Sequence, residues 1–282
     1  MKLCRYGKPG YEKPGMIDGE GKLRDLSKVV DNLGPNEISP RGLKMLTRLK
    51  ADSLPLVNGN PRLGAPYVGI GKLVAIGLNY SDHAKEAGLP IPSEPIVFMK
   101  ATTCINGPYD DVIQPRNSTK LDWEIELGVV IGTTARYVDE ASALSHVAGY
   151  CIVNDVSERA FQMATTQWDK GKGFDTSGPI GPWLVTTDEI QDPQTLDMKL
   201  EVNGKVMQSG NTRTMVFDVA KIISHVSQYM TLLPGDVIAT GTPPGVGLGM
   251  KPPVFLKPGD VMTLTIEGLG QQRQKVVPYS AQ

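Results

Sequence analysis

The chain has 282 residues, with 29 lysines and arginines against 30 aspartates and glutamates, for a formal net charge of -1. On folding, a chain of this length buries about 70 to 75% of the surface that the unfolded chain exposes to water, so a large core can form without disulfides. The balanced charge lacks the basic excess that binds phosphate backbones or anionic lipid, so we expect a small-molecule ligand, no nucleic acid and no membrane.

The spacing of the cysteines and the composition of the N-terminus favour a reducing, cytoplasmic compartment. Cys4, Cys104 and Cys151 are far apart and outside any C-x-x-C pair, which is typical of reduced thiols. The N-terminus has no apolar signal segment, and no window approaches the ~20 apolar residues of a membrane span. We therefore expect a soluble, cytoplasmic protein.

The first part of the chain differs in charge and composition from the rest. Residues 1–69 hold 12 lysines and arginines and 7 aspartates and glutamates, a net charge of +5, and are rich in Pro-Gly, Asp-Gly and Asn-Gly pairs. The apolar run at residues 73–77 follows. This change predicts a small, β-rich N-terminal domain at 1–69 and a second domain at 70–282, although the charge difference alone is also compatible with compositional drift.

The remaining chain carries more strand signals than helix signals. An Asn-Gly pair at residues 203–204 lies between alternating residues, which is typical of a tight hairpin. Two Pro-Gly pairs each precede a β-branched run. The sequence therefore predicts a mainly β fold with some α, in the α+β class. In chain order, the predicted elements are a strand at 73–77, a helix at 81–87, strands at 123–131 and 147–153, a helix at 156–166, a hairpin at 200–207, a helix at 215–230, and strands that follow the turns at 234–235 and 258–259.

A histidine and a glutamate lie three residues apart on the helix predicted at 81–87. At this spacing the carboxylate of Glu86 can hold one imidazole nitrogen of His83 and leave the other free as a base. Such a pair also occurs on ordinary solvated helix faces. Prolines and a glycine bound the segment, which therefore resembles a lid.

Two glutamates lie close together in the strand predicted at 123–131. Alternate residues of a strand share a face, so Glu124 and Glu126 project together while Trp123 and Ile125 project the other way. Adjacent carboxylates on a half-buried face repel each other unless a cation neutralises them or one is protonated. The pair indicates either a site for a hard metal ion or an acidic strand face in water.

Asp155 ends the next apolar run and is a third acidic candidate. It either opens a helix through an Asp-x-x-Glu capping box or binds a metal ion at the end of a strand. On a helix, Arg159 and Gln162 would share the face of Asp155, which suits a substrate carboxylate. Three carboxylates without nearby cysteine or histidine pairs favour Mg²⁺ or Mn²⁺ over zinc.

Two further segments carry polar groups beside glycines. Lys172 lies between two glycines that would let the backbone approach a ligand closely. Thr242 lies in a Thr-Gly-Thr-Pro-Pro-Gly segment, whose amide and hydroxyl donors either bind a substrate anion or form an ordinary tight turn. Neither segment matches a P-loop or a dinucleotide-binding motif.

Five motifs in a fixed order carry a family resemblance. Over about residues 70–270, the chain resembles the fumarylacetoacetate hydrolase superfamily. The resemblance implies a mixed β-sandwich roll preceded by a small N-terminal domain, and a homodimer. The motifs are Gly77-Leu-Asn79-Tyr80-x-x-His83-x-x-Glu86, Glu124-x-Glu126, Asn154-Asp155-x-x-x-Arg159-x-x-Gln162, Lys172-Gly-Phe174-Asp175 and Thr240-Gly-Thr-Pro-x-Gly245.

The resemblance also implies roles for individual residues. Many members carry arginine where this chain has Leu78, so a substrate contact made there is missing or differently placed. The implied roles are Mg²⁺ or Mn²⁺ binding by Glu124, Glu126 and Asp155, catalysis by His83, Glu86 and Lys172, and substrate contacts from Arg159, Gln162 and Thr242.

The implied activity is hydrolysis of a carbon-carbon bond in a 2,4-diketo acid of the acylpyruvate type, giving pyruvate and a carboxylic acid. His83 would activate water, while the cation and Lys172 would stabilise the pyruvate enolate. The N-terminal segment resembles that of bacterial members that act on sugar-derived acids such as 2,4-diketo-3-deoxy-L-fuconate or -rhamnonate. The alternatives are oxaloacetate decarboxylation, isomerisation of an unsaturated keto acid, and a non-catalytic metal- or ligand-binding protein.

Overall fold

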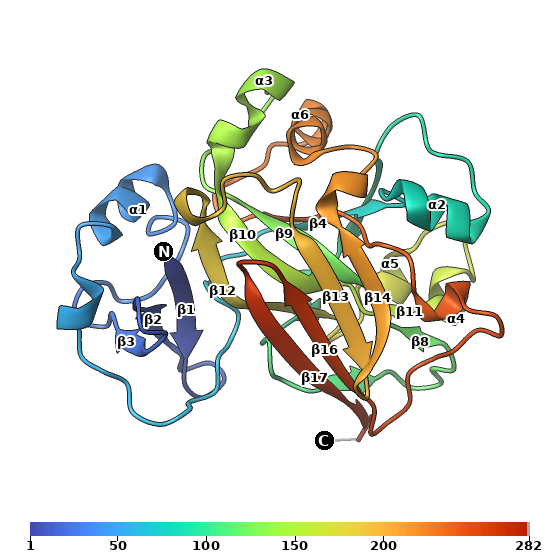
Figure 1. Ribbon diagram of the computed structural model, residues 1–282, viewed down its shortest axis with the longest axis horizontal. Helices are drawn as coiled ribbons and strands as arrows, with labels where there is room; N and C mark the ends of the chain where they lie inside the picture. The colour runs from blue at the N-terminus through green and yellow to red at the C-terminus, as the bar shows by residue number, and fades with distance from the viewer. Residues whose placement is uncertain (281–282) are drawn as a thin grey trace.

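The computed structural model describes residues 1–280 and contains two packed β-sheets with short helices around their edges (Figure 1). The mainly β fold with some α is confirmed. Within the described residues, the larger sheet has ten strands, in the order β3-β2-β1-β12-β10-β9-β15-β4-β5 with β6 beside β12. Its strands are β1 (Lys2–Tyr6), β2 (Lys13–Ile17), β3 (Leu23–Asp25), β4 (Leu73–Gly77), β5 (Ile96–Lys100), β6 (Ile105–Asn106), β9 (Ile125–Ile131), β10 (Val147–Asn154), β12 (Gly178–Thr186) and β15 (Val237–Ala239).

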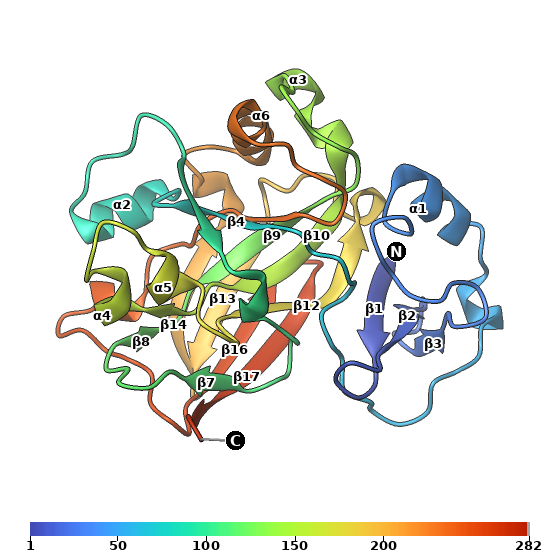
Figure 2. The same cartoon turned by 180° about the vertical axis from the view of Figure 1, so that it is seen from behind.

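The second sheet lies across β9 and β10 (Figures 1 and 2). It runs in the order β14-β13-β16-β17-β7, and a short pair, β8 with β11, lies at one end of the sandwich. The strands are β7 (Val112–Gln114), β8 (Leu121–Asp122), β11 (Ser157–Glu158), β13 (Asp197–Val202), β14 (Lys205–Asn211), β16 (Val261–Ile266) and β17 (Gly270–Pro278).

The helices are short and lie outside the sandwich. None in residues 1–280 combines the length and apolar character needed to cross a membrane. The α-helices are α1 (Pro40–Leu46), α2 (Ser81–Ala87), α3 (Glu140–Ala143), α4 (Arg159–Gln162), α5 (Asp169–Lys172) and α6 (Val219–Tyr229), and the 3-10 helices are Ala51–Ser53, Thr102–Cys104, Leu144–His146, Thr187–Glu189, Thr212–Thr214 and Gly247–Gly249.

The strand β9 shows how side-chain alternation builds the two faces of the larger sheet. Ile125, Leu127 and Val129 are fully buried in the core between the sheets. Val130 points to the opposite face, where it joins a second apolar cluster. The sequence therefore places apolar side chains on both faces of β9, as expected for a central strand, and the face of Glu126 is the one that points away from the sandwich core.

The N-terminal residues form a lobe on one side of the molecule (Figures 1 and 2). Its strand β1 pairs with β12, with Leu3 opposite Leu184, so the larger sheet continues into the lobe. Leu33 and Leu46 of the lobe share one apolar cluster with Val130 of β9. A domain boundary at residue 69 stays a prediction, since both the sheet and this cluster continue across it.

The turn signals were accurate, whereas one helix is shorter than its periodicity predicts. Asn203 and Gly204 connect β13 to β14, with φ angles of 52° and 79°. The helix predicted at 215–230 begins only at Val219, capped by the side chain of Asp218. The residues just before it form a bend, in which the side chain of Asn79 holds the backbone N–H and carbonyl of Phe217.

Candidate active site

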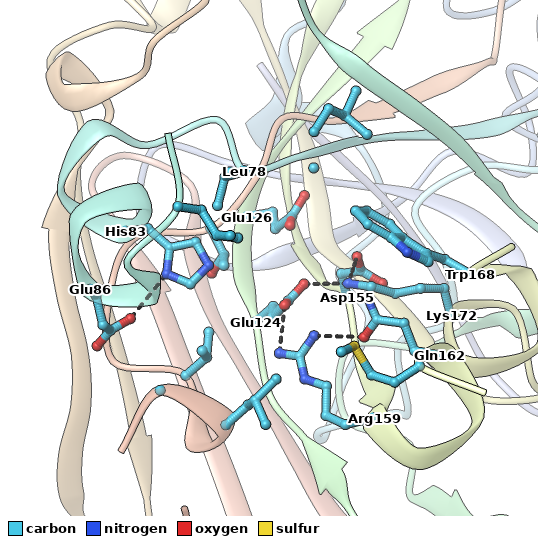
Figure 3. A pocket seen from close by; sticks show the side chains of 18 of the residues that line it. Leu78, His83, Glu86, Glu124, Glu126, Asp155, Arg159, Gln162, Trp168 and Lys172 are labelled. Atoms are coloured by element: carbon cyan, nitrogen blue, oxygen red, sulfur yellow. Dashed lines mark hydrogen bonds and ion pairs between the residues drawn. The ribbon is translucent and has the colours of Figure 1, made fainter. Parts of the chain in front are cut away.

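A cavity of about 760 Å³ opens at the edge of the larger sheet (Figure 3). Strands β9 and β10 are antiparallel, with Ile125 opposite Asn154, so the start of β9 lies beside the end of β10. Strands β4 and β15 are parallel and end at the same edge. The sheet topology therefore brings the ends of four strands, and the residues that follow them, around one cavity.

Three buried carboxylates form the floor of this cavity. Glu124, Glu126 and Asp155 each offer one oxygen, and these atoms all lie within 4.8 Å of one another. The two glutamates share one side of the strand, because Ile125 between them packs into the sandwich core. The N–H of Asp155 donates to the carbonyl of Glu124 at 2.9 Å, so pairing at the strand ends assembles the predicted triad.

Two buried lysines neutralise part of this negative charge. Lys172 Nζ donates to Glu124 Oε2 at 2.5 Å and to Asp155 Oδ2 at 2.6 Å. Lys100, which ends β5, donates to Asp155 Oδ1 at 2.6 Å and to the carbonyl of Lys172. Sequence reasoning missed Lys100, although a lysine at the end of the apolar run 96–99 is a detectable signal of a buried cation.

Arg159 supplies a third buried cation, beside Gln162. Its Nε donates to Asp122 Oδ2 at 2.9 Å, Nη2 to Glu124 Oε1 at 2.7 Å, and Nη1 to Gln162 Oε1 at 3.0 Å. Asp122, which the sequence reasoning also missed, accepts the N–H of Gly247 at 2.7 Å. In this arrangement the guanidinium orients Glu124, and a direct contact of Arg159 or Gln162 with substrate stays a prediction.

These residues meet by a different route from the predicted one. The helix expected at 156–166 is wrong at its start, because β11 pairs with β8 and keeps this backbone extended. Helix α4 begins at Arg159, and Glu158 is its N-cap, with Oε2 accepting the N–H of Phe161 at 2.7 Å. Asp155 therefore shares no helical face with Arg159.

The glycines beside Lys172 serve the packing of the chain and not the approach of a ligand. A Cβ at Gly171 would lie 2.3 Å from the backbone nitrogen of Gln162. A Cβ at Gly173 would lie 2.9 Å from the backbone nitrogen of Ala101. Helix α5 therefore packs tightly against α4 and the end of β5, and this packing fixes the backbone that carries Lys172.

The two glutamates of the floor differ in their electrostatics. Burial opposes ionisation of Glu124, but the charges of Lys172 and Arg159 outweigh burial and lower the pKa of Glu124 to about 2. Glu126 makes no ion pair within residues 1–280. Burial, with the charges of Asp155 and Glu124, raises the pKa of Glu126 well above its ordinary value.

The buried carboxylates around the floor outnumber the buried cations, so one negative charge is available to a bound metal ion. Within residues 1–280, Glu126 lacks an ionic partner, and its Oε2 accepts only a backbone N–H, that of Gly241 at 2.8 Å. Oxygen donors of this kind suit Mg²⁺ or Mn²⁺. The residues therefore fit a divalent ion held by the triad. The triad of the floor and the neighbouring Asp122 make four buried carboxylates, against three buried cations, Lys100, Arg159 and Lys172.

The predicted dyad faces the floor from α2 (Figure 3). His83 Nδ1 lies 3.0 Å from Glu86 Oε2, and Glu86 Oε1 accepts the N–H of Gly245 at 2.9 Å. The helix spans the predicted residues and ends at Gly88, which has a φ of 67°. Glu86 therefore holds one side of the imidazole, and the other nitrogen is directed toward the carboxylates.

The segment at 240–247 binds protein carboxylates with its backbone. It was expected either to hold a substrate anion or to form a tight turn. Three of its amides fasten the loop to the triad, to Asp122 and to the dyad, so these three are not free for a substrate anion in this structure. The contacts run from Gly241 to Glu126, from Gly245 to Glu86 and from Gly247 to Asp122.

Thr242 lines the cavity but uses its hydroxyl internally. Its Oγ1 donates to the carbonyl of Ile125 at 2.8 Å and accepts from Gln208 Nε2 at 2.7 Å. Gln208, a fully buried residue of β14, also accepts the N–H of Ile125 at 3.0 Å. The side-chain amide of Gln208, which was not predicted from the sequence, ties the backbone between the two glutamates to the Thr242 segment.

The cysteines have no part in this site. Cys4, Cys104 and Cys151 are buried and unpaired, as expected for reduced thiols. Burial raises the pKa of each thiol, which disfavours the nucleophilic thiolate.

The chain matches a known family model over most of its length and individual members over nearly its whole length. The model of the fumarylacetoacetate (FAA) hydrolase C-terminal family matches residues 72–277. A 2,4-didehydro-3-deoxy-L-rhamnonate hydrolase from a Sphingomonas species is 61% identical over 278 residues, which cover 98% of this chain and 96% of that protein.

Solved structures agree with this match. Fumarylacetoacetate hydrolase from the psychrophilic Exiguobacterium antarcticum is 38% identical, with a TM-score of 0.89 over 99% of this chain and 100% of that one. A maleylpyruvate hydrolase from a Sphingobium species, solved in complex with manganese(II) ion and pyruvate, is 29% identical. Its TM-score is 0.83, over 99% of this chain and 100% of that chain.

Proposed function

The chain belongs to the fumarylacetoacetate hydrolase family and is a hydrolase, and we propose that it uses a divalent cation to cleave a carbon-carbon bond in a 2,4-diketo acid. The products are pyruvate and a second carboxylic acid. The main support for this proposal is that the buried triad and the His83–Glu86 dyad face each other across one cavity. A cation site and a general base are thus available to the same substrate.

Each catalytic residue has a separate task in this reaction. Bound by Glu124, Glu126 and Asp155, Mg²⁺ or Mn²⁺ would supply positive charge to the oxygens of a 2-keto acid. The free ring nitrogen of His83 takes a proton from the water that attacks the C4 carbonyl. The C3–C4 bond then breaks, C3 keeps the electron pair as the enolate of pyruvate, and the proton held by His83 returns to this fragment. Glu86 keeps the ring oriented and stabilises the imidazolium that forms.

Lys172 and the residues around it hold the pyruvate end of the substrate. The ammonium group of Lys172, a few ångströms from the cation site, stabilises the negative charge that develops on this fragment. Arg159, Gln162 and Thr242 line the same part of the cavity and are the proposed substrate contacts. Their polar groups now bond to one another or to the protein, so substrate would have to share or replace those bonds.

The relatives support this assignment. The rhamnonate hydrolase at 61% identity supports a sugar-derived diketo acid, and the maleylpyruvate hydrolase supports manganese and a pyruvate fragment. A cytoplasmic location and a homodimer stay predictions.

The test is release of pyruvate from a panel of 2,4-diketo acids, measured with EDTA and after addition of Mg²⁺ or Mn²⁺. We expect activity that EDTA abolishes and the metal restores. His83→Ala should lower kcat by about 10²- to 10⁴-fold, whereas His225→Ala, a histidine of α6 outside the cavity lining, should leave kcat unchanged. Full activity in EDTA, or full activity of His83→Ala, would refute the assignment.

Decarboxylation and isomerisation would use the same floor without an attacking water. The dyad counts against decarboxylation, which needs no base, whereas isomerisation would use the same base to move a proton and differs from hydrolysis in its products. If His83→Ala kept its turnover of oxaloacetate and no diketo acid released pyruvate in the wild type, decarboxylation would replace the proposal. Turnover of an unsaturated keto acid without bond cleavage would indicate an isomerase, and binding of oxalate with no turnover of any acid would indicate a binding protein.

A further inference from the structure

The cavity has an apolar outer part that the proposed chemistry does not use. The floor and the dyad are polar, but the wall between them and solvent is built from large apolar side chains. The wall residues come from three separate segments, around α2, between α4 and α5, and after β15. We call Leu78, Leu89, Met163, Trp168, Leu248 and Met250 the outer wall.

Several outer-wall side chains are exposed to water in the free protein. Leu89 is 54% exposed, Met163 70% and Leu248 40%. Apolar side chains that are scattered singly over a surface need no explanation, but these three converge on one cavity. A ligand that covered them would gain binding energy from removing apolar surface from water.

Polar partners are scarce in the same region. Among the described lining residues outside the triad, the cations that pair with it and the dyad, Lys251 is the one charged side chain, and it is exposed at the rim. The amide and hydroxyl side chains of the described lining, Gln162 and Thr242, bond to Arg159 and to Ile125 beside the floor, and the indole N–H of Trp168 is the one further side-chain donor of the described outer part. A ligand hydroxyl or carboxylate enclosed here would lose water without gaining a matching set of hydrogen bonds.

The wall near the floor is fixed in shape. Gly77 has no room for a side chain, since a Cβ there would lie 2.7 Å from a ring carbon of Trp168. Trp168 in turn packs edge-on against Phe98, with ring centroids 5.3 Å apart. Leu78 has a φ of 52°, a strained conformation for leucine, and it lines the cavity on the side of Glu126 and His83 (Figure 3).

The volume also exceeds what a keto acid head group requires. At about 760 Å³ the cavity falls in the range of pockets that enclose most of a drug-sized ligand. With the keto acid on the floor, the acyl group beyond C4 is the part of the substrate that reaches the outer wall.

We propose that the outer wall is a subsite for an apolar acyl terminus, so that preferred substrates are 2,4-diketo acids whose acyl group ends in a methyl, alkyl or aryl group. The proposal rests on the proposed function, because the floor must hold the diketo acid for the acyl terminus to reach this wall. Acyl groups that end in a hydroxymethyl group or a carboxylate are turned over less well.

Two substrate series test the subsite through kcat/KM. In the first, the acyl group of an acylpyruvate lengthens from acetyl to butanoyl to hexanoyl, and we expect about a fourfold gain for each methylene that is buried. In the second, one sugar-derived diketo acid is compared with its analogues that end in hydroxymethyl or carboxylate in place of methyl. We expect the methyl compound to be preferred at least about tenfold, the cost of one unpaired buried polar group.

Variants assign the preference to the wall. Leu248→Ser should reduce the ratio of hexanoyl to acetyl kcat/KM, whereas Leu144→Ser, the same change at a leucine 45% exposed outside the cavity lining, should leave that ratio unchanged. Leu78→Arg should weaken alkyl substrates and improve the substrate that ends in a carboxylate. An unchanged preference in both Leu248→Ser and Leu78→Arg would overturn the subsite.

Binding of N-alkyl oxamates, measured by calorimetry with Mg²⁺ present, tests the apolar subsite independently of the proposed function. If diketo acids release pyruvate but hydroxymethyl or carboxylate tails are preferred, the subsite is wrong and the proposed function stands. If no diketo acid is cleaved, the proposed function fails. In that case, oxamate affinity that rises with alkyl length would still support an apolar subsite, and affinity independent of length would reject it.

Discussion

Replacing Glu126 by glutamine removes the one floor carboxylate that has no ionic partner within residues 1–280. The triad oxygens lie within 4.8 Å of one another, and two unit charges at that distance repel by about 3.5 kcal/mol at an effective dielectric constant of about 20. Protonation relieves part of this repulsion, because burial and the neighbouring carboxylates raise the pKa of Glu126. We therefore expect Glu126→Gln to stabilise the metal-free protein by about 2 kcal/mol, a Tm higher by about 3 to 4 °C.

Thermal unfolding with and without metal tests this expectation. Metal at about 100 times its Kd stabilises the wild type by about 2.7 kcal/mol. The variant lacks one ligand and should gain little from the same metal concentration. The stability advantage that Glu126→Gln shows in EDTA should therefore disappear in Mg²⁺ or Mn²⁺.

Glu158→Gln is the matched control for this change. Glu158 is also a buried glutamate, but it lies outside the triad and accepts the backbone N–H groups of Lys120 and Phe161. Its variant should lower the Tm in both conditions and keep the metal-induced shift. The reasoning fails if Glu126→Gln lowers the Tm in EDTA as the control does and still responds fully to metal.

Three further changes test the surroundings of the site and the N-terminal lobe. Lys100→Met removes a fully buried cation from Asp155, so the free energy of unfolding from urea titration should fall by about 3 to 5 kcal/mol; an unchanged value would contradict the ion pair. Gln208→Leu should raise the Kd for Mn²⁺ about tenfold, because Gln208 holds the backbone N–H of Ile125 between the two glutamates and so positions them, whereas an unaltered Kd would show that Gln208 does not position the triad. Burial opposes ionisation of Glu12, but hydrogen bonds and the charges of Arg62 and Arg5 outweigh it and lower the pKa of Glu12. Its contribution to stability is therefore complete above the unfolded pKa of about 4.3 and is lost as the pH falls through the lower folded value. The wild type should thus lose more Tm than Glu12→Gln on acidification below about pH 4, and parallel pH curves would refute this.

Local patterns predicted the parts of the site that a single segment supplies. Strand alternation correctly placed Glu124 and Glu126 on one face, and the three-residue spacing of His83 and Glu86 gave the dyad. The partners that the sequence did not reveal act over long separations. Gln208 bonds to Ile125 across 83 residues, and no periodicity in either segment encodes that contact.

Tertiary contacts also explain where local prediction failed. The capping box expected at Asp155 is wrong, because pairing of β11 with β8 moves the helix start to Arg159 and makes Glu158 the N-cap. The apolar spacing from Met215 fits a helix, yet the side chain of Asn79 holds the backbone of Phe217 in a bend. In both places a hydrogen bond to a distant segment overrides the local preference of the backbone.

The pairing of β1 with β12 has a consequence for the order in which the chain folds during synthesis. The partner of Leu3 is Leu184, so β1 is made long before the strand that completes its side of the sheet. At about 5 to 20 residues per second, the 181 residues that follow Leu3 up to Leu184 take about 9 to 36 seconds to make. During this time, β1 is an open edge, the kind of structure that pairs with other nascent chains. The net charge of +5 on residues 1–69 then acts as protection, because equally charged nascent segments repel one another until β12 arrives.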